Sequence, residues 1–290
     1  MPQSLFARAN NINIHYLREG RGPPLVLLHG WPEFCRVWEP MMAALRDRFE
    51  LFAPDLRGFG DTTKPYSGPT EEMTSRVLAD DLGAFLDAVD VHRPVGLVAH
   101  DVGAIVAQVF ARRSPERLRG LFLFNCPHPG IGSRWIAPDH VGEVWYQTFN
   151  CLPWAAAMVG ASRETCRLYI GHILRHWAAD KHAFHKDLER FVDNFIKPGN
   201  LQGGFNWYLS NRAARRAVWR DQVPDLPPIE VPTRVFWGEH DPVLKAEWMD
   251  RLPETFATLH ASVAKGVGHF VHYEAPERAA AEIAKFFDRW

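Results

Sequence analysis

The segment VGLVAHDVGAIVAQ, residues 95–108, most constrains the fold of this chain. An apolar run typical of a buried strand ends just before Asp101, and helix-forming residues resume directly after it. Ala99 and Gly103 stand two positions before and two positions after this aspartate. A strand that turns sharply into a helix needs small residues there, because the backbone is crowded. The segment therefore predicts a strand, a tight turn that presents Asp101, and a helix; alternatively, Asp101 only caps that helix.

Short apolar runs alternate with helix-like segments along most of the chain. We predict strands over residues 11–20, 23–30, 49–55, 94–100, 118–125, 233–239 and 260–266, and helices over residues 37–48, 70–89, 103–115 and 275–290. Several of the strands are continuously apolar, as expected for parallel strands that are buried on both faces. The alternation predicts an α/β fold with a mostly parallel central sheet and helices on both faces.

The alternation stops between residues 130 and 231. This stretch contains aromatic, helix-like segments and no clear strand, and it ends in the proline-rich VPDLPPIEVP, residues 223–232. A helical insertion that rejoins the sheet afterwards is typical of a lid. We therefore predict a core domain of residues 1–129 and 232–290, with a helical cap domain of residues 130–231 inserted into it.

Composition and charge exclude several classes of protein. The 290 residues are 47% hydrophobic and 23% charged, which is typical of a globular protein. The net charge is -1 and no basic stripe is interleaved with aromatics, so we expect neither a nucleic-acid nor a membrane partner. No apolar run is long enough to span a bilayer and no secretory signal is evident, so we expect a cytoplasmic location. The cysteines form no CxxC pair, and we expect reduced thiols.

Two further residues follow apolar runs and complete a catalytic pattern. Asp241 ends RVFWGEHD and His269 ends VAKGVGH. A carboxylate that attacks an electrophilic carbon forms an ester, and a histidine oriented by a second carboxylate can activate water to hydrolyse it. The chain order resembles that of the α/β-hydrolase fold, with Asp101 as nucleophile, Asp241 as acid and His269 as base. His272 is an alternative base, whereas Asn125 ends another strand and cannot carry the charge of an acid.

The segment HGWP, residues 29–32, follows a predicted strand. At this place the α/β-hydrolase fold has a loop that contributes one backbone N–H to an oxyanion hole, and the residue after the nucleophile contributes the other. We therefore predict that the N–H groups of Trp31 and Val102 bind the oxyanion. His29 and Glu33 are expected to support the loop, with no further role assigned to them.

The chain resembles the soluble bacterial epoxide hydrolases of the α/β-hydrolase superfamily. The resemblance rests on segments that span nearly the whole chain, namely HGWPE, PDLRGFGDT, AHDVGA, WGEHD and VGHF. The first two are common in the superfamily. The third is narrower, because an aspartate nucleophile in HD-x-G is shared mainly by epoxide hydrolases and by haloalkane or haloacetate dehalogenases.

The resemblance implies two lid tyrosines whose hydroxyls hold the epoxide oxygen. WYQTFNCLP and GGFNWYLSN resemble the two family segments, which places the pair on Tyr146 and Tyr208. Each could instead be a packed lid aromatic. Dehalogenases generally have a tryptophan or an arginine directly after the nucleophile, where this chain has Val102.

The function implied by the resemblance is the conversion of an epoxide and water to a vicinal diol through a covalent aspartyl ester. It implies a small apolar epoxide as substrate and no cofactor, and a monomer or homodimer is expected. His172 and His176 are spaced as possible metal ligands, but no clustered acidic residue or cysteine completes a site, so we predict no metal. The alternatives are a dehalogenase that uses the same nucleophile and a non-catalytic binding protein of the same fold.

Overall fold

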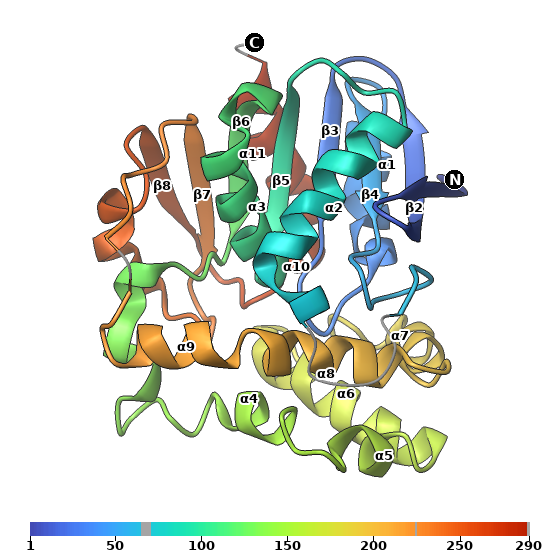
Figure 1. Cartoon of the computed structure of the whole chain (residues 1–290), viewed down its shortest axis with the longest axis vertical. Coiled ribbons are helices and arrows are strands. Elements are labelled where there is room, and N and C mark those ends of the chain that lie inside the picture. The colour runs from blue at the N-terminus through green and yellow to red at the C-terminus, as the bar shows by residue number, and fades with distance from the viewer. Residues whose placement is uncertain (65–70, 224, 289–290) are drawn as a thin grey trace.

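The structure is a computed structural model that describes residues 1–64, 71–223 and 225–288. Within these residues the centre is an eight-stranded sheet in the order β1-β2-β4-β3-β5-β6-β7-β8 (Figure 1). The strands are β1 (Gln3–Ala9), β2 (Ile12–Gly20), β3 (Pro24–Leu28), β4 (Glu50–Pro54), β5 (Val95–His100), β6 (Leu118–Phe124), β7 (Thr233–Gly238) and β8 (Leu259–Ala264). β2 pairs antiparallel with β1 and β4, and every neighbouring pair from β4 to β8 is parallel. The predicted mostly parallel sheet is confirmed.

The edge strand β1 was not among the predicted strands. Only Ala7 and Ala9 of its seven residues are buried. Two small buried side chains do not produce the apolar run by which a strand is recognised in a sequence. β1 forms because its backbone pairs with β2 over its whole length, from Gln3 opposite Arg18 to Ala9 opposite Ile12.

Helices cover both faces of the sheet. α2 (Ser75–Ala88) packs against α3 (Val102–Arg113), and α1 (Glu39–Leu45), α10 (Val271–Glu274) and α11 (Pro276–Phe287) pack together. Figure 1 shows α2 and α3 in front of the sheet and α11 behind it. Short 3-10 helices connect these elements: η1 (Cys35–Trp38), η2 (Glu71–Met73), η3 (Pro115–Arg117) and η5 (Ala246–Glu254).

The helix predicted over residues 70–89 begins later than expected. Residue 70 lies outside the described residues, and residues 71–73 form η2. α2 begins at Ser75 because the Thr74 side chain accepts a hydrogen bond from the backbone N–H of Val77. An oxygen in this position satisfies one of the N–H groups that a helix leaves unpaired at its start.

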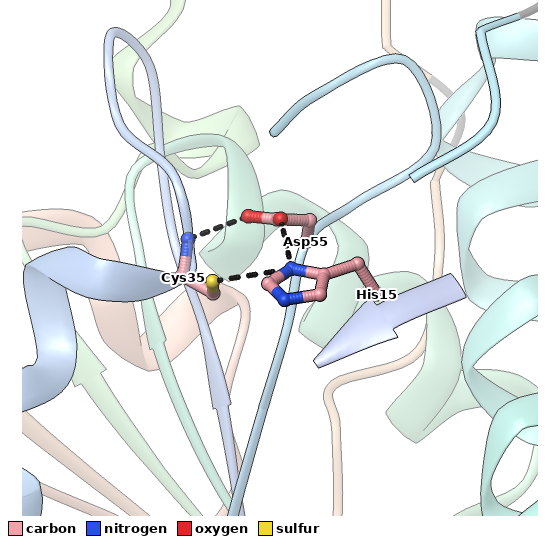
Figure 2. Close-up of side chains that lie close together, drawn as sticks. All are labelled: His15, Cys35 and Asp55. Atoms are coloured by element: carbon pink, nitrogen blue, oxygen red, sulfur yellow. Dashed lines mark hydrogen bonds and ion pairs between the residues drawn. The ribbon is translucent and has the colours of Figure 1, made fainter. Parts of the chain in front are cut away.

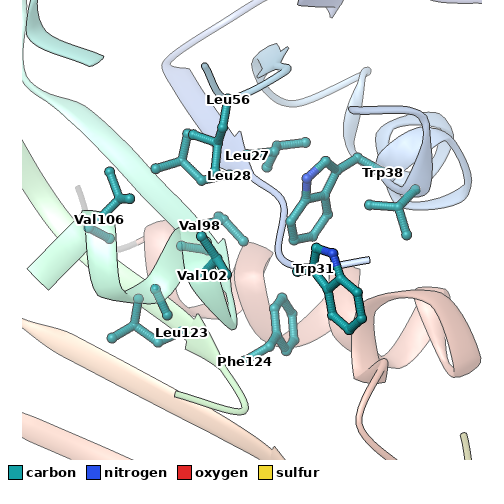
Figure 3. Close-up of a cluster of buried hydrophobic side chains, with 14 of the residues drawn as sticks. Leu27, Leu28, Trp31, Trp38, Leu56, Val98, Val102, Val106, Leu123 and Phe124 are labelled. Carbon is teal, nitrogen blue, oxygen red and sulfur yellow. The ribbon is translucent and has the colours of Figure 1, made fainter. Parts of the chain in front are cut away.

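The core is densest around the central strands β3, β5 and β6. Every residue of β3 and β5 is buried. Figure 3 shows how side chains from these strands meet those of the neighbouring loop and helices, among them Leu28, Val98, Leu123, Trp31 and Trp38. Burial of one such side chain stabilises the fold by roughly 1.5–3 kcal/mol. This packing holds the carboxyl ends of the central strands, where β5 runs into Asp101.

The residues between β6 and β7 form a layer of helices. They are η4 (Pro129–Ile136), α4 (Trp145–Phe149), α5 (Ala155–Val159), α6 (Arg163–Trp177), α7 (Leu188–Phe195), α8 (Asn200–Ser210) and α9 (Arg212–Trp219). Among the described residues of this stretch none belongs to the sheet. Figure 1 shows α4 to α9 lying across one end of the sheet. The division into a core domain and a cap domain of residues 130–231 stays a prediction.

In the parts of the chain that the structure describes, no helix combines the length and the apolar character that crossing a membrane requires.

Candidate active site

Asp101 stands at the turn between β5 and α3, with a backbone φ of 45°. This conformation costs a non-glycine residue roughly 1–3 kcal/mol, so the surrounding packing must impose it. Gly103 shows how tight the turn is, because a Cβ atom there would lie 2.4 Å from the carbonyl oxygen of Leu28. Ala99, the residue before His100 at the end of β5, is fully buried. The predicted strand, tight turn and helix are therefore present.

The loop after β3 lies directly against Asp101. The backbone N–H of Trp31 donates a hydrogen bond to Oδ2 of Asp101 over 3.1 Å. Gly30 permits this approach, since a Cβ atom there would lie 2.7 Å from Cβ of Asp101. Val102 is the first residue of α3, and N–H groups in the first turn of a helix have no partner within it. Of the two predicted backbone donors, the N–H of Trp31 is thus bonded to the Asp101 carboxylate, and that of Val102 belongs to the first residue of the helix that follows Asp101.

His269 and Asp241 form a buried pair near the same turn. Nδ1 of His269 lies 2.7 Å from Oδ2 of Asp241. Oδ1 of Asp241 accepts hydrogen bonds from the backbone N–H groups of Val243 and Leu244. Oδ2 accepts a hydrogen bond from Nδ2 of Asn125 over 2.5 Å. Asn125 therefore acts as a donor that orients Asp241, a contact that the sequence did not reveal.

The other ring nitrogen of His269, Nε2, is buried and has no hydrogen-bond partner among the described residues. Burial by itself lowers the pKa of this histidine, but the charge and hydrogen bond of Asp241 outweigh it. The charges of Asp101 and Glu33 act in the same direction, and together these groups raise the pKa of His269 to about 8. Burial also raises the pKa of Asp101, and the charge of His269 opposes that shift.

Tyr146 from α4 and Tyr208 from α8 meet around Trp31. The Trp31 ring stacks on Tyr146 with 5.2 Å between ring centroids and packs edge-on against Tyr208 at 5.4 Å. Both tyrosines are buried. Burial raises the pKa of each phenol above its usual value, and the Asp101 charge raises both further. The two phenols therefore remain protonated hydrogen-bond donors close to Asp101.

Trp177, at the end of α6, closes this aromatic group over the histidine. Its ring lies 4.9 Å from that of Tyr146 and 5.0 Å from that of His269, measured between centroids. Trp177 is not among the site residues predicted from the sequence, because the segment HILRHW that contains it was interpreted as a lid helix. The resulting surroundings of Asp101 are largely aromatic, which suits an apolar ligand.

Glu33 forms a second buried network that the sequence analysis left without a role. Its Oε2 accepts the backbone N–H of Gly30 over 2.6 Å and lies 2.9 Å from Nδ1 of His100. Its Oε1 lies 2.8 Å from Nε2 of His272. The imidazoles lower the pKa of Glu33 well below its usual value against the opposing effect of burial. His272, the alternative base, therefore pairs with Glu33, whereas His269 pairs with Asp241.

Among the described residues, two buried groups contain residue types that can ligate metals, and one is the Glu33 network just described. The other consists of His15, Cys35 and Asp55, and Figure 2 shows the imidazole of His15 directed at the Asp55 carboxylate. Asp55 already accepts the backbone N–H groups of Cys35 and Asp61. Because hydrogen bonds engage these ligand atoms, a metal would have to displace them, and we assign both groups to holding loops in place.

His172 and His176 have an acidic neighbour that the sequence did not predict. The two rings stack, with centroids 5.6 Å apart, and Nε2 of His176 lies 2.6 Å from a carboxylate oxygen of Glu143. The sequence analysis found no acidic partner because Glu143 is far from this helix in sequence. The contact is a half-exposed hydrogen bond within the segment between β6 and β7. The absence of a bound metal stays a prediction.

Comparison with known proteins identifies the family. A family model described as the alpha/beta hydrolase fold matches residues 23–276. The chain belongs to the α/β-hydrolase family. This assignment agrees with the strand order, the turn at Asp101 and the chain order of the three candidate catalytic residues.

Individual relatives confirm the resemblance to epoxide hydrolases. The soluble epoxide hydrolase of Corynebacterium sp. strain C12 is 27% identical over 97% of this chain and 96% of its own. The cis-3-alkyl-4-alkyloxetan-2-one decarboxylase of Shewanella oneidensis is 28% identical over 97% of this chain and 87% of its own. Among solved structures, the epoxide hydrolase CorEH superposes with a TM-score of 0.83 at 24% identity, covering 100% of this chain and 99% of its own, which shows a common fold.

Proposed function

We propose that this α/β-hydrolase is an epoxide hydrolase, which converts an apolar epoxide and water to a vicinal diol. One observation carries the proposal: two buried phenols from the helical layer, Tyr146 and Tyr208, pack around the loop that hydrogen-bonds to Asp101. A carboxylate can open a strained ring only if the departing oxygen is stabilised. Phenols that stay protonated can hydrogen-bond that oxygen, and one of them can supply its proton because a phenol is a stronger acid than an alcohol.

In the first proposed step Asp101 attacks a ring carbon of the epoxide. A C–O bond forms between the carboxylate and that carbon while the C–O bond of the ring breaks. The oxygen that carries the developing charge receives hydrogen bonds from Tyr146 and Tyr208, and it takes a proton from one of them. The product is a hydroxyalkyl ester of Asp101.

In the second proposed step water hydrolyses this ester. Nε2 of His269 accepts a proton from the water, and Asp241 stabilises the imidazolium that forms. The backbone N–H groups of Trp31 and Val102 hold the oxyanion of the tetrahedral intermediate, which collapses to the Asp101 carboxyl group and the departing oxygen of the diol. The carboxyl proton passes to that oxygen, and the imidazolium of His269 returns its proton to the tyrosinate left by the first step. Esterification helps this step, because it removes the Asp101 charge that raises the pKa of His269 and so favours the neutral base.

The rival functions differ in what the site must hold. A dehalogenase needs donors for a departing halide, and Val102 offers no side-chain donor where these enzymes have a tryptophan or an arginine. A non-catalytic binding protein would not need two phenols, a histidine paired with a carboxylate and a second carboxylate at a tight turn in one place. The Shewanella relative acts, by its name, on a four-membered lactone ring, so a lactone is a second candidate substrate.

Intact-protein mass spectrometry of a His269→Gln variant tests the proposal. Without its base the protein should form the ester and stop there, so exposure to styrene oxide should add the mass of the whole epoxide. Peptide mapping should place the adduct on Asp101, and a His269→Gln/Asp101→Ala double variant should stay unmodified. Organohalides and a cis-3,4-dialkyl oxetanone are run in parallel.

The outcomes separate the candidates. An adduct equal to the organohalide minus hydrogen halide, without an epoxide adduct, would identify a dehalogenase. Decarboxylation of the oxetanone by the wild type, again without an epoxide adduct, would favour the lactone. In the His269→Gln background, adding Tyr208→Phe should slow epoxide adduct formation about 10²-fold, as expected for loss of one donor to a developing oxyanion. An unchanged rate would remove Tyr208 from the mechanism.

A further inference from the structure

Glu274 connects the loop that carries His269, the candidate base, to the segment after α6. It is the last residue of α10, five positions after His269, and its side chain is partly buried. Oε2 accepts the backbone N–H groups of Ala179 over 2.8 Å, Gly268 over 3.3 Å and Asp180 over 3.4 Å. Oε1 accepts the backbone N–H of Phe270 over 3.2 Å. One carboxylate thus binds the N–H groups on both sides of His269 and those of the segment after α6.

The same two segments contact each other directly. The backbone N–H of His269 donates to the carbonyl oxygen of Trp177 over 2.9 Å. Gly268 lies so close that a Cβ atom there would be 2.4 Å from the nitrogen of Ala179. The main chain that carries His269 is therefore bonded to the end of α6 at three consecutive residues, directly or through Glu274.

A carboxylate suits this position better than a neutral side chain. Four N–H groups converge on it from two sides, and only a carboxylate presents two oxygens that both accept. A glutamine of the same shape has a single acceptor. Turned to keep the bonds to Ala179 and Gly268, its amide group would face the N–H of Phe270, and the bond beside His269 would be lost.

We infer that Glu274 is a positioning residue, which sets the place of His269 by tying its loop to the end of α6. This inference rests on the proposed function, because it concerns the base of the ester-hydrolysis step. Asp101 and the loop of Trp31 follow β5 and β3, and the four hydrogen bonds of the Glu274 carboxylate go to other segments. Loss of the Glu274 contacts should consequently impair the step that uses His269 and spare the step that uses Asp101.

Single-turnover kinetics of a Glu274→Gln variant test the inference. The variant is mixed in excess with styrene oxide, and quenched samples are analysed by intact mass to follow formation and decay of the Asp101 ester. Decay should slow about 10- to 100-fold, since misplacement of a catalytic group by an ångström has effects of this size. Formation should stay within about threefold of wild type. Glu277→Gln is the matched control, because Glu277 is exposed three residues further on.

A second measurement does not depend on the reaction. Amide hydrogen exchange at Ala179, Asp180 and Phe270 should be faster in Glu274→Gln than in Glu277→Gln. If Glu274→Gln slowed ester formation and ester decay equally, the residue would have a general structural role and the inference would be wrong. The inference would also be wrong if amide exchange became faster while the rate of ester decay stayed unchanged. Wild-type protein that forms no ester would instead overturn the proposed function, and that failure is visible before any Glu274 variant is compared.

Discussion

Two buried histidine–aspartate pairs in this protein have the same distance between Nδ1 and the carboxylate but different surroundings. Nδ1 of His269 lies 2.7 Å from Asp241, and Nδ1 of His15 lies 2.7 Å from Asp55. The second nitrogen of His15 is hydrogen-bonded to Oγ of Ser4 over 2.8 Å. The second nitrogen of His269 has no such partner among the described residues. One imidazole is thus fully engaged by the protein, and the other has a nitrogen left for a ligand.

The carboxylate of Asp55 connects three segments of the core. Asp55 accepts N–H groups from Cys35 and Asp61 as well as the imidazole, so it ties together β2, the start of η1 and the turn after β4. Burial raises the pKa of Asp55, but His15, His29 and the backbone N–H of Cys35 outweigh it and hold that pKa well below its usual value. Pairing with an aspartate therefore does not by itself assign a histidine to the candidate site. The unpartnered nitrogen separates His269 from His15, and the mutual charge effect with Asp101 separates it from His272, whose Nδ1 is also buried without a partner among the described residues.

Exchanging each histidine for glutamine gives the largest expected contrast. His269→Gln should lower steady-state diol formation by about 10⁴-fold, because it removes a general base. His15→Gln should leave the turnover number of folded protein within about threefold of wild type. Turnover with an epoxide, measured beside chemical denaturation of each variant, checks both. A His15 variant that folds and is catalytically dead would break the comparison.

Substitution of Asp55, the aspartate of the His15 pair, should affect stability and leave the chemistry unchanged. Asp55→Asn replaces an acceptor of three donors with an amide and leaves buried groups unpaired, so the free energy of unfolding should fall by about 3 kcal/mol. The folded fraction should retain its rate of ester formation. Urea denaturation combined with the ester assay measures both quantities. A stable Asp55→Asn protein with impaired chemistry would move this pair into the active site.

The smallest of the expected effects is a pH dependence of the unfolding free energy that arises from His269. The pKa of His269 is about 8 in the folded protein and about 6.5 when unfolded, so the folded state binds the proton more tightly. The resulting stabilisation is complete below the unfolded pKa and is lost as pH rises through about 8. Its upper limit is about 2 kcal/mol. Unfolding free energies at pH 6 and pH 9 should therefore differ more for wild type than for His269→Gln, and equal differences would contradict the assigned pKa.

The interior of the sheet and the turn at Asp101 were predictable because their signals are local. Continuous apolar runs marked β3 and β5, and small residues around Asp101 marked a crowded turn. β1 was missed because backbone pairing with β2, and not an apolar run, holds it in the sheet. The Glu33 network was missed for a related reason, since Glu33 and His272 are 239 residues apart and no spacing rule connects them.

The sequence by itself determined that this chain forms a mostly parallel α/β sheet with an aspartate at a tight turn, because those features depend on residues that are neighbours in the chain. Only the tertiary structure decided which nitrogen is open, which carboxylate orients which histidine and where Tyr146 and Tyr208 meet. These contacts join residues far apart in sequence, and their strength comes from burial. A hydrogen bond between His269 and Asp241 has its effect on pKa only after the fold has removed both groups from water.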